Sequence, residues 1–279
     1  MTVFIKKEAI KGLIEKTLSE DISQGDITTR NIFSKEQSGI GEVITRVPMV
    51  LCGLEIFQDV FKTLTAEANF SSCKYKDGDE IHSETTIIKV ECGVIPLMEG
   101  ERSALNILQW LSGIATMTRK YVKEVDPVKV LDTRKTTPGL RIFEKYAVKC
   151  GGGNNHRLGL YDQILIKDNH IATAGSITKA VKAIKENSNN IIEVEVKTLE
   201  EVDEALHNNV DIIMLDNMSI DMINKAITKI DAKAKTEISG GVTFERLSEI
   251  SKSGADFVSI GALTHSVAAV DISMNIKNK

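Results

Sequence analysis

The sequence predicts an α/β fold in which an α+β domain precedes a barrel of parallel βα units. Six strand-like apolar runs recur in the C-terminal half, and each ends on or near a polar or glycine residue. Stretches with helical apolar spacing separate most of these runs, and the pattern repeats at roughly 20–30 residues. Alternation of strand and helix is typical of parallel βα units, whose ligands bind at the carboxyl ends of the strands.

The six predicted strands follow one another in chain order and cover residues 128–132, 163–167, 191–196, 211–216, 235–239 and 256–260. Helical spacing between them is shown by apolar sets such as Ile177, Val181 and Ile184, or Ile220, Ile223 and Ile227. The strands lead to groups that can bind or react, namely Arg134, Lys135, Lys167, Glu195, Asp216, the Ser239-Gly240-Gly241 turn and Gly261. We therefore expect a ligand site at these strand ends.

The first hundred residues show helices and strands without strict alternation, which favours a separate α+β domain. Strands are predicted over residues 41–47, 68–75 and 85–92, and helices over the N-terminal segment, 54–64 and 100–124. We place the domains at residues 1–108 and 109–279. The last residues of the chain could pack back on the N-terminal domain.

Basic and acidic residues form separate blocks along the C-terminal half of the sequence. Eight Lys or Arg residues and three acidic residues lie from Lys129 to Lys167, whereas eight acidic residues and one Lys lie from Glu193 to Asp216. A site with a basic wall and strand-end carboxylates suits an anionic substrate together with a hard cation such as Mg²⁺. The alternative is that most of these charges lie on solvated helix faces, as we expect of residues 200–204.

Composition narrows the class of protein. The net charge of −4 gives no electrostatic attraction to nucleic acid or to an anionic membrane surface. No apolar run has the length of a membrane span, and the lysine-rich first residues hold no apolar segment typical of a signal peptide. The four cysteines show no CxxC spacing. We expect a cytoplasmic enzyme.

Two neighbouring segments carry the most specific pattern. DTRKTTPGLR (132–141) places two adjacent cations after a strand, where Arg can bind a carboxylate bidentately and Lys can bind it as a point charge. EKYAVKCGGGNNHRLGLYDQILIKDNHI (144–171) gathers three glycines, His156, Arg157 and Lys167 around one βα unit. A triple glycine alone is explained by a loop that ends a helix, but this concentration of cations is not easily explained by stability.

With these segments the chain resembles the quinolinate phosphoribosyltransferase family from end to end. The resemblance also covers EDISQGDITT (20–29), GERSALNILQWLSGIAT (100–116), IEVEV (192–196), IMLDNM (213–218), ISGGV (238–242) and GADFVSIGALTHS (254–266). It implies an N-terminal α+β sandwich domain followed by an incomplete parallel, TIM-like α/β barrel. It also implies a homodimer, or an assembly of dimers, with shared active sites, in which the N-terminal domain of one subunit caps its neighbour's barrel.

The activity implied by this resemblance converts quinolinate and phosphoribosyl pyrophosphate to nicotinate mononucleotide, CO₂ and pyrophosphate. The enzyme is a decarboxylating pentosyltransferase of de novo NAD biosynthesis that requires Mg²⁺. By motif, the catalytic residues are Lys135, Lys167, Glu195 and Asp216, and the last two lie near the Mg²⁺-pyrophosphate, directly or through water. The substrate-binding set adds Arg102 acting in the neighbouring subunit, Thr133, Arg134, His156, Arg157, Ser239, Gly240, Gly241, Ile260, Gly261, Ala262 and His265.

Two alternatives stay open. Lys167 at a strand end could form a Schiff base in a barrel lyase, although its neighbours are further cations and acids. A molybdenum-transport-associated relative of the same fold would share the barrel and part of the GER and GGG motifs. Release of pyrophosphate and CO₂ that requires both quinolinate and phosphoribosyl pyrophosphate separates these alternatives from the implied activity. The sequence does not show whether His170 and His265 are catalytic or structural.

Overall fold

The computed structural model describes residues 5–279, so the first four residues of the expected N-terminal helix lie outside the described residues. The chain forms two compact units. Unit 1 comprises residues 1–119, 142–152 and 266–279, and unit 2 comprises residues 120–141 and 153–265. The boundary predicted between residues 108 and 109 falls within helix α4 (Val94–Val125), which continues past the end of the first segment of unit 1.

Unit 1 contains an antiparallel sheet of four strands in the order β12-β1-β5-β3. The strands are β1 (Ser38–Thr45), β3 (Asn69–Phe70), β5 (Thr85–Gly93) and β12 (Ile272–Asn278), and a separate pair joins β2 (Met49–Val50) to β4 (Glu80–Ile81). The last strand of the chain therefore pairs with the first strand of the N-terminal segment. The strand predicted over 68–75 is only two residues long, because its polar side chains bury little surface at the sheet edge.

Unit 1 contains five helices among its described residues. They are α1 (Lys7–Asp21), α2 (Thr29–Ile32), α3 (Leu54–Leu64), the main part of α4, and α5 (Arg141–Cys150). Helices α1 and α3 bury apolar residues along one face. Helix α3 buries Phe57 and Phe61, whose ring centroids lie 5.2 Å apart. Helix α4 begins at Val94, earlier than the predicted start at residue 100, because Pro96 falls in its first turn, where proline fits.

Unit 2 contains a parallel sheet of six strands in the order β6-β11-β10-β9-β8-β7. The strands are β6 (Lys129–Leu131), β7 (Ile164–Ile166), β8 (Ile192–Val196), β9 (Ile212–Asp216), β10 (Lys235–Ser239) and β11 (Phe257–Ser259). Each lies inside one of the six predicted runs. The strands β6 and β7 form the two edges of this sheet, so the βα barrel is incomplete, as predicted.

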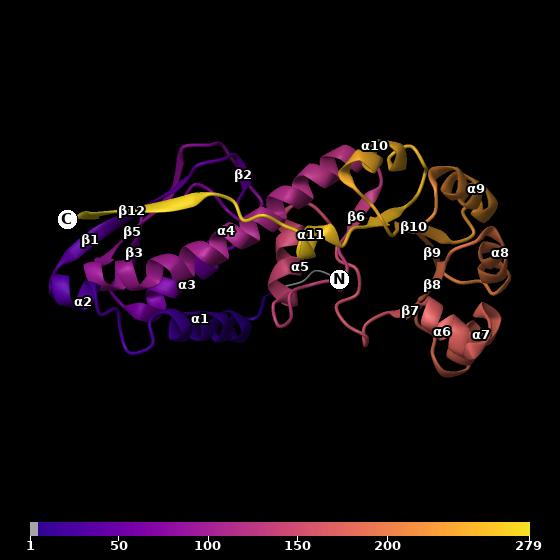
Figure 1. Ribbon diagram of the computed structural model, residues 1–279, viewed down its shortest axis with the longest axis horizontal. Helices are drawn as coiled ribbons and strands as arrows, with labels where there is room; N and C mark the ends of the chain where they lie inside the picture. Colours follow the sequence, from indigo (N-terminus) through magenta and orange to yellow (C-terminus); the bar gives the residue numbers. More distant parts are fainter. Residues whose placement is uncertain (1–4) are drawn as a thin grey trace. The chain divides into compact units, whose positions relative to one another are not determined.

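Helices connect these strands and lie along the outside of the sheet (Figure 1). They are α6 (Asp168–Ala174), α7 (Ile177–Asn187), α8 (Leu199–His207), α9 (Ile220–Ile230), the 3₁₀ turn η1 (Phe244–Arg246), α10 (Leu247–Ile250) and α11 (Ala262–His265). Three of them begin at a hydroxyl N-cap that accepts a backbone N–H of the first turn, at Ser176, Thr198 and Ser219. Most of the predicted site residues end the strands or follow them directly.

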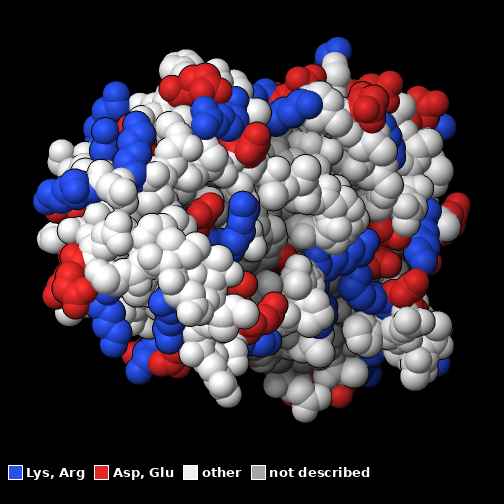
Figure 2. Space-filling model, turned by 60° about the vertical axis from the view of Figure 1, so that its left-hand side comes forward, with Lys and Arg blue, Asp and Glu red and all other residues white. Residues whose placement is uncertain are grey.

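The surface carries mixed charge. Basic and acidic side chains are interspersed on the face drawn in Figure 2, in keeping with the small net charge. Within residues 5–279, no helix has both the length and the apolar character needed to cross a membrane.

Candidate active site

The carboxyl ends of the parallel strands bring most of the predicted residues to one edge of unit 2. Lys167 directly follows β7, Glu195 is the penultimate residue of β8, and Asp216 is the last residue of β9. Ser239 ends β10, while Thr133, Arg134 and Lys135 follow β6. Because β8 and β9 are neighbours in parallel register, Glu195 and Asp216 project from adjacent strands at this edge.

Lys167 and Glu195 form an ion pair across β7 and β8. The Lys167 Nζ atom lies 2.7 Å from Oε2 of Glu195. The Glu195 side chain is nearly buried, with 8% exposed, whereas that of Lys167 is 45% exposed. The buried carboxylate is thus held in place, and the lysine can still reach a ligand from solvent.

A second cation, Lys197, follows β8 directly. Its Nζ atom lies 2.9 Å from Oδ2 of Asp168. The hydrogen bond that Lys197 donates to Asp168 raises the pKa of Lys197, and the charges of Glu195 and Asp216 add to this effect. The two strand-end carboxylates therefore lie within the electrostatic reach of Lys197.

Arg134 and Arg157 form a pair of like charges. Arg157 is 7% exposed, and its Nη1 donates to the backbone carbonyl of Gln163 at 3.2 Å. Burial, followed by the positive charge of Arg134, lowers the pKa of Arg157. Among the described residues, the buried Nε of Arg134 has no hydrogen-bond partner. Two neighbouring guanidinium groups, one buried and one partly buried, are costly without an anion, so this pair is suited to carboxylates.

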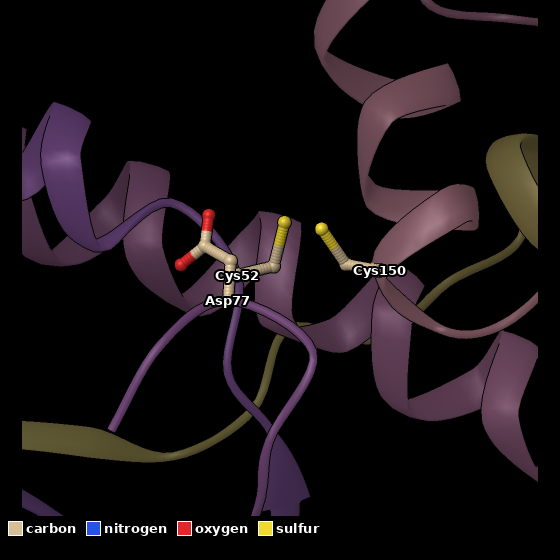
Figure 3. A group of neighbouring side chains, drawn as sticks. All are labelled: Cys52, Asp77 and Cys150. Carbon is tan, nitrogen blue, oxygen red and sulfur yellow. The ribbon is translucent and has the colours of Figure 1, made fainter. Parts of the chain in front are cut away.

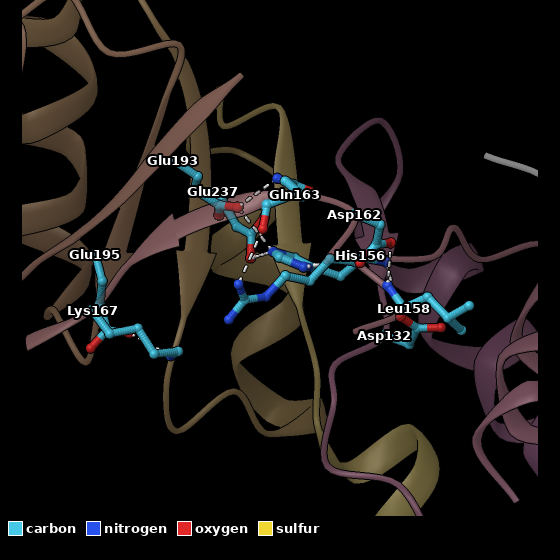
Figure 4. A network of polar contacts seen from close by, with 10 residues as sticks. Asp132, His156, Leu158, Asp162, Gln163, Lys167, Glu193, Glu195 and Glu237 are labelled. Atoms are coloured by element: carbon cyan, nitrogen blue, oxygen red, sulfur yellow. Dashed lines mark hydrogen bonds and ion pairs between the residues drawn. The ribbon is translucent and has the colours of Figure 1, made fainter. Parts of the chain in front are cut away.

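His156 makes its contacts with the protein through both ring nitrogens. Its Nδ1 accepts the Arg157 backbone N–H at 2.7 Å, and its Nε2 lies 3.1 Å from Oε2 of Glu193 and 3.7 Å from Oε1 of Glu237 (Figure 4). An accepting Nδ1 places the proton of a neutral imidazole on Nε2. His156 is predicted to belong to the cationic pocket, and its ring nitrogens face Arg157, Glu193 and Glu237.

Two glycine turns lie at the ends of β10 and β11. Gly240 has a φ of 80°, and a Cβ added there would lie 2.4 Å from Oδ1 of Asn217, so this position requires glycine. A Cβ on Gly261 would lie 3.0 Å from both Nε2 of His265 and Cδ of Lys135. The second turn therefore brings the predicted residues Lys135, Gly261 and His265 together.

Hydrogen bonds place the remaining members of the predicted set. The Thr133 hydroxyl accepts the Lys135 N–H at 3.0 Å, and the Thr264 hydroxyl donates to the Lys135 carbonyl at 2.7 Å. The N–H of Ile260 donates to the Leu131 carbonyl at 3.0 Å within the sheet. The Ile260 N–H was predicted to bind a phosphate, but it pairs with Leu131 between β11 and β6. The predicted phosphate donors that remain at this turn are the N–H groups of Gly261 and Ala262.

Two further residues of interest, Arg102 and His170, belong to helices. Arg102 belongs to α4 in unit 1, and its side chain is 68% exposed. His170 lies in the first turn of α6, where its Nδ1 accepts the Lys167 N–H at 2.9 Å. This capping contact assigns a structural role to His170.

Sequence reasoning did not assign four residues that the structure places among these groups, namely Gln163, Glu193, Lys197 and Glu237. Signals for three of them were present. Lys197 is the single basic residue of the acidic block, directly after a predicted strand. Glu193 and Glu237 are charges in the middle of predicted buried strands, and such charges require partners.

The strand-end groups of this sheet combine cations, carboxylates and glycine turns, which suits a site for anionic ligands. Residues 26–112 match the family model described as "Quinolinate phosphoribosyl transferase, N-terminal domain", and residues 114–275 match that of the C-terminal domain. The chain belongs to the quinolinate phosphoribosyl transferase family. It is accordingly an enzyme that transfers a pentosyl group.

Individual relatives agree with this assignment. The chain is 44% identical over 272 residues to the "Probable nicotinate-nucleotide pyrophosphorylase [carboxylating]" of Bacillus subtilis, covering 96% of this chain and 93% of that protein. It is 35% identical to a quinolinate phosphoribosyltransferase [decarboxylating] of Nicotiana tabacum, covering 96% and 82% of the two chains. The crystal structure of NadC from Streptococcus pyogenes matches all of both chains with a TM-score of 0.95 and 41% identity.

Proposed function

We propose that the chain converts quinolinate and phosphoribosyl pyrophosphate to nicotinate mononucleotide, CO₂ and pyrophosphate, as a step of de novo NAD biosynthesis. The names of its relatives support this reaction, since they describe a decarboxylating quinolinate phosphoribosyltransferase. The observation within the molecule that carries the proposal is the pair Arg134 and Arg157, since quinolinate is a dianion with adjacent carboxylates. Each carboxylate would receive one guanidinium, which removes the cost of placing like charges together.

The first chemical step forms the bond between the quinolinate nitrogen and the anomeric carbon of the ribose as the bond to pyrophosphate breaks. Positive charge develops on the ribose during this displacement, and no protein nucleophile is required. The nearly buried carboxylate of Glu195, held by Lys167, supplies negative charge beside the ribose. Lys135 and the glycine turns take the phosphate groups, and the arginine pair orients the ring.

The second step is decarboxylation. Once the ring nitrogen is quaternary, the carbon–carbon bond to the adjacent carboxylate can break, because the pyridinium ring stabilises the electron pair left on its carbon. CO₂ leaves and a proton takes its place. The reaction therefore requires no added organic cofactor as an electron sink.

Mg²⁺ fits the chemistry of the residues at the ends of β8 and β9. Glu195 and Asp216 are oxygen donors on adjacent strands, which Mg²⁺ prefers. Lys167 contacts Oε2 of Glu195 and Asn217 contacts Oδ2 of Asp216, so a second oxygen of each carboxylate can face a ligand. We propose that these two residues hold the ion, directly or through water. When bound, Mg²⁺ would neutralise charge on the leaving pyrophosphate.

We further propose a homodimer with shared active sites, in which Arg102 acts in the neighbouring subunit. The Arg102 side chain is 68% exposed, so it is accessible to a neighbouring subunit. Two large apolar side chains of the loop between α5 and β7, Leu160 and Tyr161, are 73% and 79% exposed, as expected of a surface that another chain covers. The cytoplasmic location stays a prediction.

The test of the function is a product assay on the purified chain. We expect pyrophosphate, CO₂ and nicotinate mononucleotide to form in equal amounts, and only when quinolinate, phosphoribosyl pyrophosphate and Mg²⁺ are all present. A Schiff-base lyase would instead be trapped by borohydride on Lys167. The ion pair of Lys167 with Glu195 argues against that alternative, because an amine nucleophile needs to lose its proton. Failure to consume phosphoribosyl pyrophosphate would overturn the proposal.

A further inference from the structure

Two buried carboxyl groups, those of Glu193 and Glu237, lie in the middle of strands rather than at their ends. Glu193 of β8 and Glu237 of β10 are 0% and 1% exposed. His156 Nε2 lies 3.1 Å from Glu193 and 3.7 Å from Glu237, and these three groups converge in Figure 4. Burying two carboxyl groups is expensive unless each has partners, so the cluster calls for a role beyond packing.

Two routes connect this cluster to Arg157, one through hydrogen bonds of Gln163 and one through the close contact of Glu193 with His156. Oε2 of Glu193 lies 2.9 Å from the side-chain nitrogen of Gln163, whose backbone carbonyl accepts Nη1 of Arg157 at 3.2 Å. The same oxygen faces His156 Nε2, and His156 Nδ1 accepts the Arg157 backbone N–H at 2.7 Å. Oε2 of Glu193 therefore contacts both Gln163 and His156, and each of these two residues contacts Arg157.

We propose that Glu193, supported by Glu237, is a positioning residue that fixes Arg157 beside Arg134 for the quinolinate carboxylates. The inference rests on the proposed function, because quinolinate is the ligand that Arg157 would bind. Neither glutamate touches substrate in this account. Glu193 acts through His156 and Gln163, and Glu237 acts through Glu193 and His156.

The protonation of the cluster agrees with this role. Burial, and then the charge of Glu193, raise the pKa of Glu237 to about 8, while His156 and Ser259 oppose the rise. A raised pKa favours the protonated form of Glu237 beside the Glu193 carboxylate. The three groups also lie close enough together to hold a metal ion, but Oε2 of Glu193 already accepts a hydrogen bond from Gln163, and Nδ1 of His156 accepts one from Arg157. We therefore interpret the cluster as a hydrogen-bonded network.

The test compares Glu193→Gln with Glu193→Leu. The glutamine carbonyl can accept the hydrogen bond of Gln163 and face His156 Nε2, whereas leucine fills a similar space and accepts no hydrogen bond. We expect the leucine variant to raise the KM for quinolinate about tenfold or more. Its KM for phosphoribosyl pyrophosphate and its kcat at saturating quinolinate should change by less than about threefold. The glutamine variant should stay close to wild type in all three quantities.

Several outcomes would overturn the proposal. A folded leucine variant with wild-type KM for quinolinate, or with both KM values raised equally, removes the positioning role. A glutamine variant as defective as leucine does the same, because the hydrogen bonds would not be what matters. If Glu193→Leu fails to fold, Gln163→Leu tests one route alone and should raise only the KM for quinolinate. Failure of wild type to use quinolinate would instead refute the proposed function.

An independent observation in unit 1 concerns two cysteines. The sulfur atoms of Cys52 and Cys150 point toward one another in Figure 3, and these atoms and a carboxylate oxygen of Asp77 all lie within 4.8 Å of one another. Asp77 is already engaged, since its oxygens accept the N–H groups of Gly53 and Leu54 and the hydroxyl of Tyr146. The two thiols are thus the reactive groups that remain.

We propose that Cys52 and Cys150 form an oxidisable pair. Cys52 is buried, whereas Cys150 is partly exposed and can be reached by a small oxidant such as hydrogen peroxide. The thiolate of Cys150 attacks the peroxide, so that an S–O bond forms and the O–O bond breaks, releasing hydroxide. Cys52 then loses its proton and attacks this sulfur, forming the S–S bond and releasing water. Two thiols are oxidised and one peroxide is reduced to two waters.

A hydrogen bond from Cys52 lowers the pKa of Cys150, which favours attack by Cys150 first. Treatment of the full chain with hydrogen peroxide should reduce the thiol count from four to two and give a cross-linked peptide of Cys52 and Cys150. Cys150→Ser should prevent the cross-link, and Cys73→Ser, which alters another partly exposed thiol, should leave it unchanged. Four persistent thiols, or oxidation of Cys150 without a cross-link, would overturn the proposal.

Discussion

The Arg157 guanidinium has a pKa lowered by its burial and by the positive charge of Arg134, so two cations stand together at the strand ends of unit 2. Arg134 has a buried Nε without a hydrogen-bond partner among the described residues. This arrangement is unfavourable for the empty protein and becomes favourable when a dianion is bound. It is the basis of the predictions on substrate binding.

Removing either guanidinium should abolish tight quinolinate binding. Arg134→Ala and Arg157→Ala each leave one carboxylate without its partner, which costs about 2–5 kcal/mol of binding free energy. Calorimetric titration with quinolinate measures this loss, and titration with phosphoribosyl pyrophosphate serves as the control. Wild-type affinity in either variant would exclude that arginine from the site.

The strand-end carboxylates should govern turnover rather than quinolinate binding. Glu195→Gln and Asp216→Asn remove charge proposed to face the ribose and Mg²⁺, so we expect kcat to fall by about a hundredfold. Steady-state kinetics and quinolinate titration of the same preparations separate the two effects. A collapse of quinolinate affinity with unchanged turnover at saturation would reverse the assignment.

Gly240 should be needed for binding phosphoribosyl pyrophosphate. In Gly240→Ala the new Cβ would meet Asn217 Oδ1 at 2.4 Å and must displace the turn. Gly139 provides a matched control, since it has the same φ of 80° but nothing within 4 Å of an added Cβ. We expect a raised KM for phosphoribosyl pyrophosphate in Gly240→Ala only. Equal effects of the two substitutions would show backbone strain in place of a phosphate turn.

The buried Glu237 should make stability depend on pH. Its pKa is raised from 4.5 to about 8, so between these values the folded chain binds more protons than the unfolded chain. The free energy of unfolding contributed by Glu237 therefore falls as pH rises through this window, by on the order of 1 kcal/mol per pH unit. Above pH 8 it should change no further.

Chemical denaturation at pH 5.5, 7 and 8.5 tests this dependence against Glu237→Gln, which cannot ionise. The difference in unfolding free energy between wild type and variant should shift in favour of the variant as pH rises. A difference that stays constant with pH would show that Glu237 is ionised throughout.

The active site should be shared between subunits. An Arg102→Ala subunit keeps an intact barrel and a Lys167→Ala subunit keeps an intact cap, so mixed dimers gain one complete site. Under exchange conditions with random pairing, about a quarter of wild-type sites should return, as expected of a two-fold interface. Activity of the mixture no greater than that of the separate variants would place Arg102 in the site of its own subunit.

The sequence predicted the six parallel strands within one or two residues, because buried parallel strands form continuous apolar runs. It also predicted Lys167, Glu195 and Asp216 at strand ends, since position along a strand fixes which residue reaches the edge. The pairing between strands could not be predicted in the same way. The ion pair of Lys167 with Glu195 depends on register between β7 and β8, which no local pattern specifies.

The roles of His156 and Ile260 show the same limit. A motif places a histidine beside an arginine, but only the fold shows that its ring nitrogens face Arg157, Glu193 and Glu237. Likewise, only sheet pairing shows that the Ile260 N–H is used by Leu131. Interactions between residues far apart in the chain are therefore what the sequence could not supply.

The most direct test of the account is the preference of the enzyme for quinolinate over nicotinate, which lacks one of the two carboxylates. Measured with phosphoribosyl pyrophosphate at a fixed saturating concentration, kcat/KM should be at least about a hundredfold higher for quinolinate, because nicotinate leaves one buried arginine unpaired. Equal values of kcat/KM for the two acids would contradict the claim that Arg134 and Arg157 together recognise a dicarboxylate.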